Sequence, residues 1–251
     1  MNTVMKHLRS LFAGIAAVAV MTGTAFATTF TATDTFGRSA EAIFSVSGTN
    51  LQVTLANTSN ADVMDPTFVL TALFFSGANG LTPISALLPT GTVVFNGPSN
   101  GGNVGGEWAY GSGFTTAPHG ATAGISSSGL SPSGLFGQPN FNGPNLGGPK
   151  SLDGLQYGIT SAGDVFSTPG VGDLANNALI KNSVVFTLGG LAANFDINSI
   201  SNVSFQYGTD IANANITPPQ GPTPVPEPGT LLLLGIGGFG LAIWGKRRKS
   251  A

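Results

Sequence analysis

The stretch from residue 28 to 216 contains no segment that keeps an amphipathic helical period. Its β-branched and aromatic residues come instead in short runs separated by Gly, Asn, Ser and Pro, which is typical of strands joined by turns. In the run LQVTLA at residues 51–56, three apolar residues alternate with Gln and Thr. Alternation of this kind predicts a strand with one buried and one solvated face.

The run at residues 40–46 precedes 51–56 across a Ser-Gly-Thr-Asn turn, so we predict an antiparallel hairpin. The Gly-rich stretch 91–150, with 16 Gly and 6 Pro, is expected to form short strands and surface loops. The predicted fold class is therefore all-β, an antiparallel β-sandwich with long Gly-rich loops, flanked by an N-terminal signal helix and a C-terminal single transmembrane helix. Further strands are predicted at 67–75, 92–95, 106–114, 183–188 and 200–207.

The charges of this 251-residue chain are unevenly placed. Between residues 28 and 224, ten acidic residues face only Arg38, Lys150 and Lys181, which leaves a net charge of about −7. Nucleic-acid binding is disfavoured, because neutralising phosphates requires clustered Lys and Arg. The chain has no cysteine, which excludes a disulfide scaffold, a zinc ribbon, an iron–sulfur centre and a thiol nucleophile.

Residues 1–27 have the layout of a secretory signal peptide. Lys6 and Arg9 lie in a positive segment, residues 11–20 are apolar and uncharged, and Ala25 and Ala27 form an A-x-A cleavage site. The alternative is a membrane helix, but ten residues span about 15 Å, half the hydrocarbon core. We expect the general secretory machinery and signal peptidase as partners. The body of the protein is then predicted to span residues 28–216.

The C-terminal end has a complementary layout. A Pro-rich linker at 217–224 is expected to be extended and solvated. The uncharged stretch 229–245 is predicted to form a transmembrane helix of about 25 Å. The basic cluster that follows it is expected to stay in the cytoplasm, which places the body outside. The motif residues before the helix are Val225, Pro226, Glu227 and Pro228, and the basic cluster is Lys246, Arg247, Arg248 and Lys249.

Three features at 225–251 together resemble the PEP-CTERM sorting signal: the Pro-Glu-Pro triplet at 226–228, the short glycine-containing apolar segment and the basic tail. The resemblance implies exosortase as a partner, transient anchoring in the inner membrane of a Gram-negative cell, and then delivery to the cell surface or extracellular matrix. The alternative is a plain single-pass anchor. The body is similar to exosortase-dependent surface proteins around 69–75, 107–110, 153–158 and 203–209; that group has no assigned activity and implies no catalytic residues.

The sequence offers little catalytic chemistry. The body has one histidine, His119, and no G-x-S-x-G elbow, so we predict no enzymatic activity. Glu107 beside Trp108 raises the alternative of a secreted glycoside hydrolase, for which no partner acid is evident. No metal site and no cofactor are expected. The alternative is a structural Ca²⁺ held by Asp153, Asp164 and Asp173, which lie in Gly/Asn/Ser-rich loops.

Binding remains a second hypothesis. Four aromatic residues each lie close to a glycine: Trp108, Tyr110, Tyr157 and Tyr207. A ring that is exposed at such a place can stack on a sugar. The alternative is that all four rings fill the core. The leading hypothesis is an exported, exosortase-sorted surface or matrix protein without catalytic activity that associates with exopolysaccharide. The alternative is a carbohydrate-binding or adhesive module that uses exposed aromatic residues.

Overall fold

The computed structural model describes residues 27–148, 150–152, 154–166, 174, 176–219 and 223–224. Within these residues the chain consists of strands, loops and single 3-10 turns. The predicted signal helix and the predicted transmembrane helix at 229–245 lie outside the described residues. Among the residues described, no helix has the length and apolar character needed to cross a bilayer.

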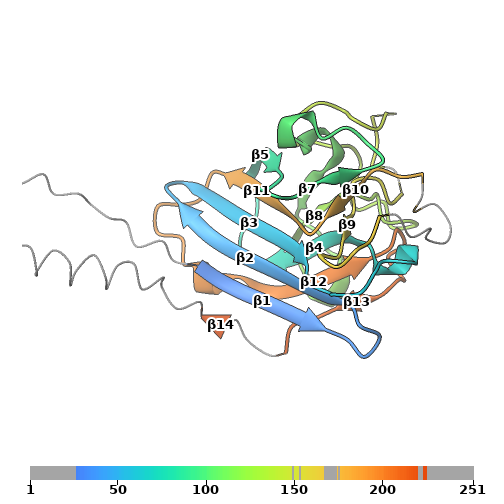
Figure 1. The fold of residues 1–251 in the computed structure, drawn as a ribbon. Helices are drawn as coiled ribbons and strands as arrows, with labels where there is room; N and C mark the ends of the chain where they lie inside the picture. The colour runs from blue at the N-terminus through green and yellow to red at the C-terminus, as the bar shows by residue number, and fades with distance from the viewer. Residues whose placement is uncertain are drawn as a thin grey trace, which may run out of the picture.

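The first sheet contains six strands, and every neighbouring pair in it is antiparallel. It includes the predicted hairpin, whose turn holds Gly48 at a φ of +61°. The strand order is β14 (Thr223–Pro224), β1 (Ala27–Thr33), β2 (Ser39–Ser47), β3 (Asn50–Asn57), β11 (Ser183–Gly189) and β5 (Thr82–Leu87) (Figure 1).

The second sheet has eight strands among the described residues and is mixed, because β9 and β10 are parallel. This differs from the predicted antiparallel pairing; a long connection between these two strands allows the chain to return in the same direction. The order is β13 (Asn215–Ile216), β12 (Ser201–Tyr207), β4 (Leu70–Ser76), β9 (Ile159–Thr160), β10 (Leu179–Lys181) and β6 (Val94–Phe95), with β8 (Ala123–Ser126) also paired to β4 and β7 (Ala109–Ser112) to β8.

The main core lies between the two sheets. On β3, Leu51, Val53 and Leu55 are fully buried while Gln52 is exposed, so the alternation predicted from the sequence is confirmed. Phe44 of β2 packs edge-on against Phe75 of β4 with ring centroids 5.3 Å apart, which joins the layers. Apolar burial of this kind is the main stabilising term of such a fold.

A second apolar cluster covers the outer face of the second sheet. Every residue of β4 is buried, because loop residues pack on the side that faces away from the main core. Phe74 contacts Phe114 and Phe136, with centroids 6.4 and 5.9 Å apart. This cover explains why β4 reads as a continuous apolar run instead of an alternating one.

The Gly-rich stretch forms short pieces, as expected. The predicted strand at 106–114 is observed as the 3-10 turn η3 (Gly105–Glu107) followed by the short strand β7. Gly106 allows a close approach of the backbone, since a Cβ there would lie 2.0 Å from the Pro144 carbonyl oxygen. The other 3-10 turns are η1 (Pro66–Phe68), η2 (Asn100–Gly102), η4 (Pro118–Gly120) and η6 (Ile197–Ser199).

Candidate functional site

The C-terminal arm pairs with β1, the first strand of the body. β14 pairs antiparallel with β1, with Thr223 opposite Thr29 and Pro224 opposite Thr28 (Figure 1). The last two residues of the predicted linker are therefore extended, and they lie against the sheet. The four sorting-motif residues and the basic cluster Lys246, Arg247, Arg248 and Lys249 lie outside the described residues, and so does Ala25.

The expected signal-peptidase site falls at the start of the same strand. Ala27 is the first residue of β1 and is paired with Ser45 of β2, and Thr28 is 2 % exposed. A protease binds its substrate as an extended chain with a free backbone. Cleavage at the expected site between Ala27 and Thr28 would therefore have to precede the pairing of this part of β1 with β2.

The four rings considered for sugar stacking are all buried. Trp108, Tyr157 and Tyr207 are 0 % exposed and Tyr110 is 6 % exposed. A ring with no accessible face cannot stack on a ligand, so the expectation of exposed aromatic residues is wrong for this set. The strands and turns that carry these rings direct them into the main core, where Trp108 meets Phe186 at 4.9 Å.

The phenol hydroxyls of Tyr110 and Tyr157 have hydrogen-bond partners in the core. The hydroxyl of Tyr110 donates to the Ala78 carbonyl at 3.2 Å, and that of Tyr157 donates to the Pro98 carbonyl at 3.1 Å. Burial raises the pKa of all three side chains, and the negative charge of Glu107 adds to the increase for Tyr157. These tyrosines therefore remain neutral and structural.

Glu107 is committed to holding a loop. Its side chain is 6 % exposed, and Oε1 accepts hydrogen bonds from the backbone amides of Leu146 and Gly147, the latter at 3.0 Å. With Oε1 bound to two backbone amides, the Glu107 carboxylate fastens the loop at 146–147 to η3. The side chain of His119, in η4, is exposed as expected for a loop histidine.

Asp164 is the one of the three candidate calcium ligands that falls among the described residues. It is 8 % exposed and accepts a hydrogen bond from the Val63 amide at 3.1 Å. Burial and the neighbouring Asp62 carboxyl raise its pKa. Asp153 and Asp173 lie outside the described residues, and within the described part no three His, Asp or Glu side chains gather as they do around a metal ion.

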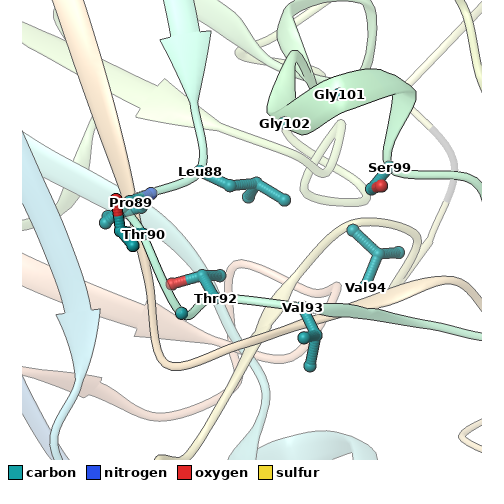
Figure 2. A pocket seen from close by; sticks show the side chains of 10 residues that line it. Leu88, Pro89, Thr90, Thr92, Val93, Val94, Ser99, Gly101 and Gly102 are labelled. Atoms are coloured by element: carbon teal, nitrogen blue, oxygen red, sulfur yellow. The ribbon is translucent and has the colours of Figure 1, made fainter.

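A surface hollow that no sequence pattern predicted lies beside β5. Its volume is about 510 Å³, within the range of small-molecule sites. Figure 2 shows the Leu88 side chain projecting between η2 and the loop that leads to Val94. Among the described residues, those that line the hollow are uncharged: Leu88, Pro89, Thr90, Gly91, Thr92, Val93, Val94, Ser99, Gly101 and Gly102. A signal could have been its Gly/Thr/Ser content, but that composition also describes ordinary loops.

The molecule thus combines a two-layered β body with a C-terminal arm that leaves the body at a defined point. Within this arm, residues 224–249 match the model of the PEP-CTERM protein-sorting motif. The match begins at Pro224, the residue that lies opposite Thr28. No curated protein and no solved structure matches the chain significantly. The motif supports an exported protein that is sorted to the surface and processed by exosortase.

Proposed function

We propose that the chain is an exosortase-sorted protein of the cell surface or extracellular matrix, that its body is a structural module without catalytic activity, and that it associates with exopolysaccharide. The observation that carries this proposal is the sorting motif at 224–249, which starts where the last strand of the body ends. In the proposal the segment 229–245 anchors the precursor in the inner membrane until exosortase acts.

The arrangement of the body favours a structural module over an enzyme. Its largest buried side chains are aromatic and aliphatic, and Glu107 is hydrogen-bonded to backbone amides of a neighbouring loop. A densely packed apolar core gives a stable and rigid unit. Such a unit is suited to persistence outside the cell, where no chaperone supports it.

The sorting step is tested by replacing Pro226, Glu227 and Pro228 with alanine and fractionating the host cells. We expect the variant to remain in the inner membrane at precursor size. The matched control replaces Pro218 and Pro219, which lie outside the matched motif, and is expected to be processed normally. Normal size together with normal surface delivery of the motif variant contradicts exosortase sorting.

Exopolysaccharide association needs a surface other than the four buried rings. We propose the hollow for this role, because it is uncharged and because Thr90, Thr92 and Ser99 present hydroxyl groups on its lining. Neutral hydroxyl and apolar groups together are the lining expected for a neutral glycan. Replacing Ser99 with Trp should fill the hollow and weaken retention on the host's isolated exopolysaccharide, whereas Thr82→Trp at the other end of β5 should not. Equal retention of both variants contradicts this role of the hollow.

A further inference from the structure

The first and last strands of the described body end side by side in the first sheet. β1 and β14 are antiparallel with Thr28 opposite Pro224, so the first residues of β1 and the last residue of β14 lie at the same end of the sheet. Paired strands lie about 4.8 Å apart. The residues that adjoin both expected processing sites, Ala27 and Pro224, therefore lie at one end of the body, which we name the terminal end.

Strand register shows what else lies at the terminal end. β2 continues past the partner of Ala27 to Ser47, so the turn at Gly48 and Thr49 lies there, and the Leu191 amide donates to the Thr49 carbonyl at 3.0 Å. From the second sheet, Ser76 pairs with Ser201 near η6, and η6 contacts β1 and β2. The turn from Ser47 to Thr49 is exposed and uncharged.

The opposite end, which we name the loop end, holds the β1–β2 turn at residues 34–38. Asn57, at the end of β3, donates to the carbonyls of Phe68 and Ile159, which places η1 and β9 beside it. The hollow extends toward the same end, because Val93 accepts a hydrogen bond from the amide of Lys181, whose pairing partner Thr160 ends β9.

The length of the C-terminal arm restricts how far the terminal end can be from a membrane. Gly229, where the predicted apolar segment begins, follows Pro224 by five residues, which span at most about 17 Å when fully extended. While this segment is in the bilayer, the terminal end stays within that distance of the lipid. An uncleaved signal peptide at Thr28 would tether the same end.

The charges of the body are distributed consistently with this tether. Among the described residues, Asp196 is the acidic residue at the terminal end, where it caps η6. Among the described residues the loop end carries five acidic residues against two cations, Arg38 paired with Asp34 and Lys181 beside Asp164, so its net charge is negative. Bacterial bilayers that contain anionic lipid repel a net negative charge over about 10 Å. The five are Asp34, Asp62, Asp65, Asp164 and Asp210.

We propose that the terminal end is a membrane-facing surface, which lies against lipid headgroups in the precursor, so that the acidic loop end and the hollow point away from the bilayer. The proposal rests on the membrane anchoring contained in the proposed function. It adds an orientation that the motif alone does not specify. Because the β1–β14 pair is part of the body, it would hold this orientation until exosortase cuts the arm.

The test uses single cysteines, since the chain has none of its own. Thr49→Cys places a label in the β2–β3 turn at the terminal end, and Thr35→Cys places one in the β1–β2 turn at the loop end; both positions are exposed. The mature chain, which starts at Thr28 so that no signal peptide tethers the same end, is labelled with a fluorescent maleimide and reconstituted into vesicles of phosphatidylethanolamine and phosphatidylglycerol that contain a headgroup-nitroxide lipid. We expect several-fold stronger quenching at position 49 than at position 35.

Equal quenching at the two positions, or stronger quenching at position 35, overturns the proposal. A second form of each variant carries a flexible Gly/Ser insert of roughly 20 residues after Pro224, and we expect the difference between the positions to shrink in it. An undiminished difference contradicts the short tether as its cause. Because the vesicles contain no exosortase, this outcome is separate from the sorting test; a chain that fails to float with the vesicles overturns the anchoring on which the orientation rests.

Discussion

Asp62 and Asp164 hold two loops together by a reciprocal exchange of hydrogen bonds. Asp164 Oδ1 accepts from the Val63 amide at 3.1 Å, and Asp62 Oδ1 accepts from the Val165 amide at 2.9 Å. Each carboxyl thus binds the backbone directly after the other aspartate, although the two residues are about a hundred positions apart in the chain. Lys181 lies beside the pair, and its Nζ donates to the Asp164 backbone carbonyl at 2.8 Å.

This pair gives a pH dependence with a defined sign. Burial and the Asp62 carboxyl raise the pKa of Asp164 above its ordinary value near 3.8, so the folded state binds its proton more tightly than the unfolded state. The contribution of this group to stability is complete below the ordinary pKa and is lost as the pH rises through the raised pKa. We therefore expect Asp164→Asn to be more stable than the parent at pH 7, by about 1 kcal/mol, and similar to it at low pH.

Urea unfolding of the parent and of Asp164→Asn, at pH values spaced evenly between roughly 3 and 8, measures this difference in stability. Asparagine keeps an acceptor for Val63 and gains a donor toward Asp62, which imitates the protonated acid. A variant that loses stability at pH 7 but not at pH 3 would show that Asp164 is stabilised as an anion, contrary to this account.

Asp65 gives a pH dependence of stability whose sign is opposite to that of Asp164. Its Oδ1 accepts from the Thr67 amide at 2.8 Å and from the Thr67 hydroxyl at 2.7 Å, and these bonds lower its pKa. Its contribution is present above the ordinary pKa and is lost as the pH falls through the lowered one. Asp65→Ala should cost about 1 kcal/mol at pH 7 through loss of the cap of η1, and less in acid. The same unfolding series checks it, and a cost that grows in acid would refute the assignment.

Trp108 distinguishes a core role from a binding role. Its ring is fully buried, and its Nε1 has no hydrogen-bond partner within the described part of the chain. We expect Trp108→Ala to lower the free energy of unfolding by about 3–5 kcal/mol. Trp108→Phe should cost clearly less, because it keeps most of the apolar volume and removes the unpaired donor.

Chemical unfolding of both variants, run beside retention on isolated exopolysaccharide, separates the two roles. If Trp108 belongs to the core, retention falls only in the fraction of molecules that unfolds. Loss of retention by a fully folded Trp108→Ala variant would instead show that the ring contacts the glycan.

Asn57 joins the two sheets through its side chain. Nδ2 donates to the carbonyls of Phe68 and Ile159, each at 3.1 Å, while Oδ1 accepts from the amide and hydroxyl of Ser59. Asn57→Ala leaves these groups without their partner in a buried place, and we expect a cost of roughly 2–5 kcal/mol. The control is Asn50→Ala, at the other end of β3, where a loss below about 1 kcal/mol is expected. Similar melting temperatures for the two variants would contradict the role of Asn57.

The sequence alone was sufficient to predict those features of the protein that are decided by residues close together in the chain. The alternation at 51–56 and the Gly48 turn specify the central hairpin, because side-chain period and turn chemistry act over a few residues. The sorting motif is likewise a contiguous segment, so its 26 matched residues could be recognised without the fold. The missed strands include β1, which adjoins the predicted signal peptide, and β9, which is two residues long.

The tertiary structure alone decided which side chains are accessible and which distant segments meet. A ring beside glycine is exposed or buried according to what packs over it, and Trp108, Tyr157 and Tyr207 are covered by strands far away in the chain. The same holds for the Asp62–Asp164 exchange and for the pairing of Thr28 with Pro224. The sequence by itself determined where the protein is sent; long-range packing, which no local pattern encodes, determined what its surface presents there.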